Sequence, residues 1–217
     1  MSDAIRVGLV GFGYASKTFH APLIGGTPGM ALKAVASSDA DKVHADWPGV
    51  KVMSAPGDLL DDPDIDLVVI ATPNDTHFPL AKAALEAGKH VVVDKPFTVT
   101  LSQARELESL AKHCGRVLSV FHNRRWDSDF LTVRALINEG QLGEVCYFES
   151  HFDRFRPQVR QRWREQGGPG SGIWYDLGPH LLDQAVVLFG LPVSITVDLA
   201  QLRPGAQSTD YFHAVLA

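Results

Sequence analysis

The sequence has little cysteine, no long apolar run and no excess of positive charge. Its two cysteines, Cys114 and Cys146, lie far apart and outside any CxxC pair, which favours reduced cytosolic thiols over a disulfide framework. No apolar run approaches the roughly 18 residues of a spanning helix, and the N-terminus lacks the apolar core of a signal peptide. A net charge of -5 gives no general attraction to nucleic acid or acidic membranes. We therefore expect a cytoplasmic protein that binds neither.

The histidines, cysteines and acidic residues do not occur at the spacings typical of metal ligands. We therefore expect no metal. What is present is an ordinary globular composition of 217 residues, 45% hydrophobic and 21% charged. This length accommodates one large domain or one and a half ordinary ones.

In the first half of the chain, short apolar segments alternate with helical ones. Strands are expected at residues 5–10, 32–36, 51–53, 66–72, 90–94 and 117–121. Helices are expected at residues 15–24, where Pro22 ends or kinks the helix, at 76–86, capped by Thr76, and at 102–113. This alternation predicts right-handed βαβ units and an α/β fold with a doubly wound parallel sheet over residues 1–122.

After His122 the pattern changes. The sequence predicts a helix at residues 127–139, an exposed strand at 144–152, a helix at 175–189, and strands at 194–202 and 211–217. A loop of roughly 20 residues, rich in Arg and Gly, precedes residue 172, and loops of that length are usually functional or disordered. We assign residues 123–217 to the first part of an α+β domain with an open sheet, whose last segment looks like a strand in progress.

A glycine-rich turn follows the first strand and opens a helix. Gly11 allows a tight turn, Gly13 lets a pyrophosphate approach the backbone, and Ser16 stands where a third small residue is wanted. In this context the turn predicts dinucleotide binding, the alternative being a glycine-rich turn in another doubly wound protein. The expected cofactor contacts are Gly11, Phe12, Gly13, Tyr14 and Ala15.

The end of the second strand bears on which cofactor binds. NAD-binding proteins usually place an acidic residue there to hold the ribose 2′-hydroxyl. Here Ser37 and Ser38, with Lys42 nearby, suit a 2′-phosphate, which favours NADP. NAD remains the alternative, with Asp39 as the ribose acid if the strand runs longer.

Two groups of residues are candidates for chemistry. Lys95 follows Asp94 at the carboxyl end of a buried strand, where open α/β sheets bind ligands, and a partly desolvated ammonium can transfer a proton. Asp176 and His180, four residues apart, share one helix face, so that the carboxylate can orient the imidazole. Either Lys95 or His180 can serve as the base in carbinol oxidation. The spacing is equally compatible with a helix-start aspartate and a buried structural histidine.

Several motifs occur together in one order. They are Gly11-x-Gly13, Thr72-Pro73-Asn74 with His77, Asp94-Lys95-Pro96, Leu142-Gly143-Glu144-Val145 and Asp176-x-x-x-His180. As a set they resemble the Gfo/Idh/MocA (glucose–fructose oxidoreductase/inositol dehydrogenase) family, with its Rossmann domain. The segments 19–23 (FHAPL) and 122–126 (HNRRW) resemble its YdgJ-like branch, which is similar to NADP-dependent scyllo-inositol dehydrogenases.

The resemblance implies an NAD(P)-dependent oxidoreductase acting on CH–OH groups of a sugar, polyol or cyclitol. Lys95 would position the substrate hydroxyl, His180 would act as base, and Asp176 would contact substrate. The implied cofactor contacts are Thr72, Pro73, Asn74, His77, Asp94 and Lys95, and the proposed substrate contacts are Asn123, Arg124, Trp163, Asp176 and His180. Asp94 replaces the commoner glutamate. Because the family's second domain usually carries dimer contacts, the full-length protein is expected to be a homo-oligomer.

Other functions stay open at this point. A protein that binds NAD(P) as a sensor needs no catalytic set, and an NAD-dependent glycoside hydrolase of the same family would show no net cofactor reduction. The loop arginines, Arg154, Arg156, Arg160, Arg162 and Arg164, lie beside Trp163. This pattern can bind single-stranded nucleic acid, but the acidic balance of the chain favours a loop that closes over substrate or a solvated surface loop.

Overall fold

The computed structural model describes residues 4–217. Residues 1–3, part of the N-terminal stretch on which the expectation of no signal peptide rests, lie outside the described residues. The chain divides into two compact units, residues 1–121 and 122–217, and each is described by itself. Within the described residues, no helix has both the length and the apolar character needed to cross a membrane.

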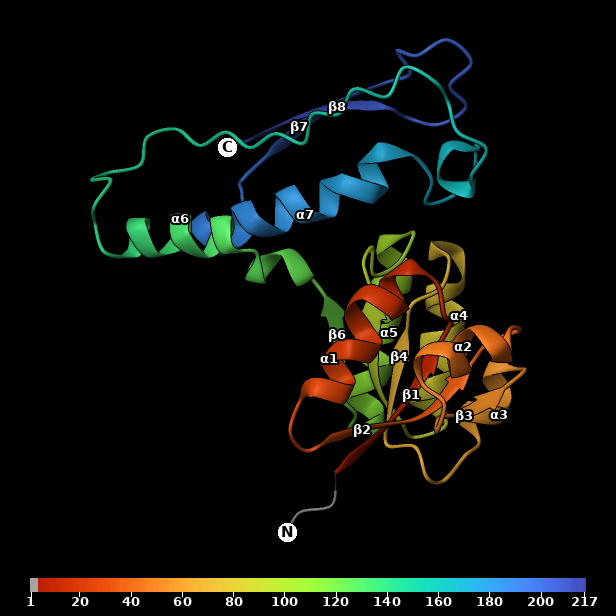
Figure 1. The fold of residues 1–217 in the computed structure, drawn as a ribbon. Coiled ribbons are helices and arrows are strands. Elements are labelled where there is room, and N and C mark those ends of the chain that lie inside the picture. Colours follow the sequence, from red (N-terminus) through yellow and green to blue (C-terminus); the bar gives the residue numbers. More distant parts are fainter. Residues whose placement is uncertain (1–3) are drawn as a thin grey trace. The chain divides into compact units, whose positions relative to one another are not determined.

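The first unit contains a six-stranded parallel sheet. Its strands are β1 Ile5–Val10, β2 Met30–Ala36, β3 Lys51–Met53, β4 Leu67–Ile70, β5 His90–Asp94 and β6 Leu118–Phe121. They lie in the order β3-β2-β1-β4-β5-β6, and every neighbouring pair is parallel (Figure 1). The predicted doubly wound sheet is therefore confirmed. The order reverses between β1 and β4, which is where such sheets bind ligands.

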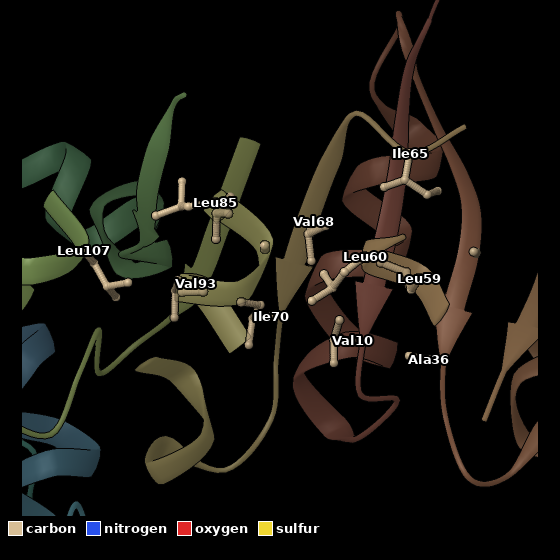
Figure 2. Close-up of a cluster of buried hydrophobic side chains, with 14 of the residues drawn as sticks. Val10, Ala36, Leu59, Leu60, Ile65, Val68, Ile70, Leu85, Val93 and Leu107 are labelled. Carbon is tan, nitrogen blue, oxygen red and sulfur yellow. The ribbon is translucent and has the colours of Figure 1, made fainter. Parts of the chain in front are cut away.

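Both faces of the sheet are buried by helices. The helices are α1 Ala21–Gly26, α2 Ala40–Asp46, α3 Pro56–Leu60, α4 Asn74–Glu86 and α5 Leu101–Cys114. Alternate strand residues point to opposite faces, so Leu9 belongs to a cluster with residues of α1 and α2, whereas Val10 belongs to a separate cluster that includes Leu59, Leu85 and Leu107 (Figure 2). Burying each such side chain contributes roughly 1.5–3 kcal/mol. Burial on both faces explains why the strands are almost continuously apolar.

Two predicted helix features are wrong in detail. The helix expected at 15–24 contains a π-helical turn, η1 Ser16–His20, and Pro22 lies in the first turn of α1 instead of ending the helix. Proline is tolerated in a first turn because its missing N–H needs no partner there. Thr76 does not cap α4, which begins two residues earlier behind Pro73; the Thr76 hydroxyl instead donates to the Pro73 carbonyl at 2.6 Å.

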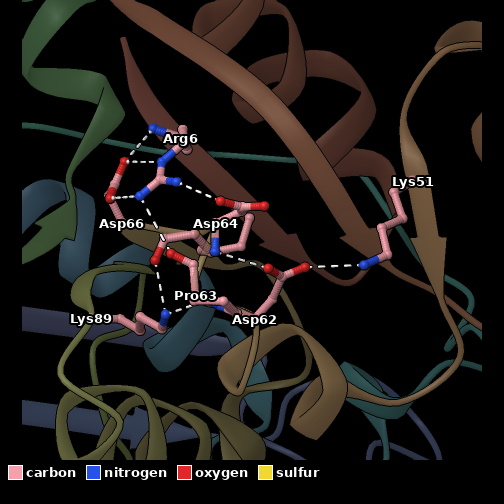
Figure 3. Close-up of polar contacts among 8 residues, drawn as sticks. Arg6, Lys51, Asp62, Pro63, Asp64, Asp66 and Lys89 are labelled. Atoms are coloured by element: carbon pink, nitrogen blue, oxygen red, sulfur yellow. Dashed lines mark hydrogen bonds and ion pairs between the residues drawn. The ribbon is translucent and has the colours of Figure 1, made fainter. Parts of the chain in front are cut away.

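An ion pair joins β1 to the start of β4. The Arg6 guanidinium donates through Nε and Nη2 to the two carboxylate oxygens of Asp66, at 3.0 and 2.7 Å (Figure 3). The backbone N–H of Arg6 adds a bond of 2.8 Å to the same carboxylate. These hydrogen bonds lower the pKa of Asp66 to about 2, against a smaller opposing effect of burial.

We expect D66N to make the unit less stable at neutral pH but not at pH 2. The lowered pKa means that Asp66 stabilises the fold above its unfolded pKa of about 4 and loses this contribution as the pH falls towards about 2. Both side chains are more than a third exposed, so we expect about 1 kcal/mol. Urea unfolding at several pH values measures the difference. The control is D64N, since Asp64 also pairs with Arg6 but is 81% exposed; an equal loss in both variants would contradict the assignment.

The second unit consists of helices and one hairpin. Its elements are η2 Asn123–Trp126, α6 Ser128–Asn138, η3 Trp163–Glu165, α7 Gly172–Phe189, β7 Ile195–Ala200 and β8 Tyr211–Leu216. β7 and β8 pair antiparallel, and α7 packs against β8 (Figure 1). The strand predicted at 144–152 is wrong: these residues form no described strand, and the only partner of β7 in the described sheet is β8. An alternating pattern favours an extended chain but does not supply a partner strand.

Candidate active site

The glycine turn after β1 is tightly enclosed by the sheet. Gly11 has a φ of 89°, and its N–H donates to the Ala36 carbonyl at 3.0 Å. A Cβ atom at this position would lie 2.7 Å from the Ala71 carbonyl oxygen. Fully buried Ser16 donates its hydroxyl to the Gly11 carbonyl at 2.8 Å, so the serine that departs from the glycine pattern stabilises the same turn.

Gly13 differs from Gly11 because the space beside it is open. A Cβ atom built at Gly13 meets nothing within 4 Å, and the residue is exposed. The neighbouring Tyr14 is 77% exposed, whereas the Phe12 side chain is buried in the core. The open backbone at Gly13, at the start of a helix, fits an approaching pyrophosphate. Any contact from Phe12 to a cofactor would come from its backbone.

The end of β2 lies next to this turn. The strand ends at Ala36, so Ser37 and Ser38 follow its carboxyl end directly. Asp39 caps α2, accepting from the Lys42 backbone N–H at 3.0 Å. Ser38 and Lys42 are exposed.

His77 connects the turn after β4 to the turn after β5. The imidazole is 1% exposed; its Nδ1 lies 2.8 Å from the Pro96 carbonyl oxygen and its Nε2 lies 3.0 Å from the Thr72 carbonyl oxygen. Both partners are acceptors, and a neutral imidazole can donate to only one of them at a time. A role of His77 in cofactor binding would therefore be exerted through the two turns that it holds. Thr72 is also hydrogen-bonded to the Thr76 hydroxyl at 2.6 Å, and Asn74 is buried at the start of α4.

Asp94 holds the backbone at the candidate catalytic lysine. Its carboxylate accepts from the Lys95 backbone N–H at 2.7 Å and lies 3.5 Å from Nε2 of buried His20. Burial opposes ionisation of Asp94 most strongly, but His20 and the Lys95 backbone N–H together lower its pKa. His20 packs against the Phe121 ring, 4.3 Å between ring centres. His20 was not predicted from the sequence as a site residue, although it lies in the motif at residues 19–23.

In the second unit, α7 carries both Asp176 and His180. His180 is buried, and an oxygen of Asp176 lies 3.6 Å from Nε of Arg164. The Arg164 guanidinium stacks 4.4 Å from the Trp163 ring centre, so the long loop and the helix meet at Asp176.

Asn123 and Arg124 lie in η2, beside the other end of α7. Arg124 pairs with Asp127 at 2.7 Å and lies 4.9 Å from the Phe152 ring centre. Its backbone carbonyl accepts from Gln184 of α7 at 2.9 Å. These contacts tie η2 to the helix that carries the candidate catalytic pair.

A buried charge network, which sequence reasoning missed, holds the arginine loop. Arg203 lies 3.2 Å from Glu165 and 2.8 Å from Asp210, and both carboxylates are at least 93% buried. Glu165 also accepts from the Arg160 backbone N–H and from Arg162. The network is hidden in the sequence because Arg203 lies 38 residues after Glu165 and no periodic pattern relates the two. Within residues 4–217, no group of three or more potential metal ligands comes together.

The structure thus gathers the cofactor candidates at the carboxyl ends of β1, β2, β4 and β5 in the first unit, with Lys95 among them. Asp176, His180, Trp163, Asn123 and Arg124 belong to the second unit. The first unit therefore has the architecture of a Rossmann-type dinucleotide-binding domain.

Comparison with known proteins agrees with this class. Residues 5–122 match the model described as "Oxidoreductase family, NAD-binding Rossmann fold", and residues 130–217 match the "GFO/IDH/MocA C-terminal domain". The chain belongs to the Gfo/Idh/MocA family of oxidoreductases.

Individual relatives are similar in sequence to the chain over all or nearly all of its length. The uncharacterized oxidoreductase YdgJ of Escherichia coli is 81% identical over 100% of the chain and 63% of YdgJ. The scyllo-inositol 2-dehydrogenase (NADP(+)) IolW of Bacillus subtilis is 39% identical over 99% of the chain and 60% of IolW. The solved structure of the YPO2259 putative oxidoreductase from Yersinia pestis superposes with a TM-score of 0.93 at 71% identity, over 100% of the chain and 61% of that protein. The chain therefore spans just over three-fifths of the length of these relatives.

Proposed function

We propose that this chain belongs to an NADP-dependent oxidoreductase that transfers a hydride between the nicotinamide and a CH–OH or carbonyl group of a sugar, polyol or cyclitol. The observation that carries the proposal is the pair of glycines in the β1 turn. Gly11 is required by its positive φ and by the nearby Ala71 carbonyl, whereas Gly13 leaves its side open, as a bound pyrophosphate requires. Such a cofactor supplies the hydride when bound.

Residues of the chain itself would bind the substrate and transfer the hydroxyl proton. Lys95, held at the end of β5 by the Asp94 carboxylate, would donate a hydrogen bond to the reacting oxygen. His180 would take up the hydroxyl proton, and Asp176 would bind substrate. These roles rest on the family resemblance and on the placement of Lys95 where doubly wound sheets bind ligands. Asn123, Arg124 and Trp163 are proposed as further substrate contacts, and the full-length protein is proposed to be a homo-oligomer.

The preference for NADP is supported by the end of β2. Because the strand stops at Ala36 and Asp39 caps α2, the Asp39 carboxylate already accepts a backbone hydrogen bond. Ser37, Ser38 and the Lys42 ammonium remain as the groups suited to a 2′-phosphate.

We expect K42M to weaken NADPH binding about tenfold and to leave NADH binding unchanged, since only NADPH carries the phosphate that the ammonium would contact. Titration followed by nicotinamide fluorescence measures both affinities. K33M is the matched control, because Lys33 is an exposed lysine of the same strand–helix unit. An unchanged NADPH affinity would assign Lys42 to the solvated surface, and equal losses for both cofactors would show that it does not contact the 2′-phosphate; either result would favour NAD.

The activity itself is tested by incubating the protein with NADP⁺ and a panel of polyols, cyclitols and nitrophenyl glycosides, while nicotinamide absorbance and nitrophenol release are followed separately. A dehydrogenase gives net reduction in proportion to substrate consumed. Glycoside cleavage without net reduction would contradict the proposal in favour of a hydrolase that uses the cofactor transiently. Cofactor binding without turnover of any substrate by the full-length protein would favour a sensor.

A further inference from the structure

The second unit contains a cavity with an excess of positive charge. Its volume is about 320 Å³, within the usual range for sites of small molecules. Five arginines and three carboxylates line it, an excess of two positive charges. The arginines are Arg154, Arg156, Arg162, Arg164 and Arg203, and the carboxylates are Glu165, Asp176 and Asp210.

Three of the arginines are neutralised by the three carboxylates. Arg162 pairs with Glu165 at 2.8 Å, Arg203 with Asp210 at 2.8 Å, and Arg164 with Asp176 at 3.6 Å. Arg203 also lies 3.2 Å from Glu165, and this contact fixes the loop against the connection between β7 and β8.

Arg154 and Arg156 supply the excess. Neither guanidinium forms an ion pair with any carboxylate in the part of the chain that the structure describes. Burial and the neighbouring positive charges of Arg154, Arg160 and Arg162 lower the pKa of Arg156, with only Glu165 opposing them. Like charges held together in this way are stabilised by an anion that binds among them.

The cavity also reaches Asp176, the proposed substrate contact on α7. Asp176 lines it directly, and so does Gly172 at the start of the 18-residue helix α7. Gly172 has a φ of 86°, and a Cβ atom there would collide with Thr209, so α7 begins in close contact with the hairpin. The positive end of the helix dipole consequently adds to the potential of the arginines.

From this geometry we propose that the enzyme acts on an anionic substrate, a sugar or polyol bearing a carboxylate or phosphate that Arg154 and Arg156 bind. The inference rests on the proposed function, since it places this anion beside Asp176 of the same reaction. A guanidinium binds carboxylate and phosphate alike through paired N–H donors. The neutral part of the ligand would lie towards Asp176.

The test is calorimetric titration of the chain, with NADPH present and absent, using matched probes. Glucose is compared with gluconate and glucose 6-phosphate, and inorganic phosphate is titrated alone. We expect the anionic sugars to bind at least about tenfold more tightly than glucose and to weaken as ionic strength rises. The stronger of the two identifies carboxylate or phosphate as the preferred group.

Arginine variants then locate the site. R156M should reduce the affinity for the anionic sugar about tenfold, and R154M should reduce it similarly, since each removes a charged donor and keeps an aliphatic stem. The control is R105M, which removes the same charge from the exposed face of α5 in the other unit and should change nothing. Because neither Arg154 nor Arg156 anchors an ion pair, both variants should keep the wild-type circular dichroism spectrum.

The inference would be overturned by glucose binding as tightly as its anionic counterparts, by an unchanged affinity in R154M and R156M, or by no detectable binding of the anionic probes. Inorganic phosphate binding as tightly as glucose 6-phosphate would also overturn it, because the polyol would then add nothing. Failure of the proposed function is seen separately, as a loss of NADPH binding by the first unit, which these variants do not touch.

Discussion

Replacing Gly11 by alanine is expected to destabilise the first unit by about 3 kcal/mol and to abolish NADPH binding. Alanine is strained at the φ of 89° found there, and its Cβ would lie 2.7 Å from the Ala71 carbonyl oxygen. Relief requires β1 and β4 to separate at the point where the Ala71 N–H donates to the Val10 carbonyl. Chemical denaturation measures the stability, and nicotinamide fluorescence measures binding.

G13A is the matched control, and it should behave in the opposite way. A methyl group at Gly13 meets no atom within 4 Å, so we expect stability to change by less than about 0.5 kcal/mol. The same methyl group would occupy the space where the pyrophosphate approaches, and NADPH affinity should fall more than about tenfold. If G13A bound NADPH normally, the turn would not be a phosphate cradle. If G11A were as stable as the wild type, the enclosed geometry of the turn would be wrong.

The second large effect is expected at Lys95. K95M should lower the rate of net NADP⁺ reduction by about 10²- to 10⁴-fold in the full-length protein, because it removes the group proposed to donate to the reacting oxygen. The methionine stem preserves packing, and the Asp94 carboxylate would still accept from the backbone N–H of residue 95. Because Lys95 is also an expected cofactor contact, NADPH affinity is measured separately by nicotinamide fluorescence. The rate is measured by nicotinamide absorbance with saturating cofactor.

Two comparisons distinguish catalysis from support of the fold. K33M removes an exposed lysine elsewhere in the sheet and should leave the rate unchanged. A solvent deuterium isotope effect on the residual K95M reaction, larger than in the wild type, would be expected if proton transfer becomes limiting. A K95M enzyme with the wild-type rate would remove Lys95 from the mechanism.

Much of the first unit could be predicted from the sequence because its signals are local. Apolar segments of strand length, separated by helical ones, predicted a sheet buried on both faces, and Gly11 with Gly13 predicted the turn where a dinucleotide would bind. The segment at 144–152 shows the limit of the same reasoning. Its alternation was as clear as that of β7, but a strand also needs a partner, and alternation does not identify one.

The candidate site shows the same division. Lys95 and the Asp176–His180 pair could be named from motifs and helical spacing. The contacts that hold them could not: His77 between two carbonyls 19 and 5 residues away, His20 beside Asp94, and Arg203 between Glu165 and Asp210. Nor could the sequence separate Arg162 and Arg164, which pair with carboxylates, from Arg154 and Arg156, since all four carry the same charge.

The sequence by itself determined the alternation of strands and helices, the turn that requires glycine, and the residues available for chemistry, because these depend on near neighbours along the chain. Only the tertiary structure decided which glycine is enclosed and which is open, which charges are neutralised, and which segments pair as strands. Those outcomes depend on distances between residues far apart in sequence, and hydrogen bonds and ion pairs form only where packing brings their partners within a few ångströms.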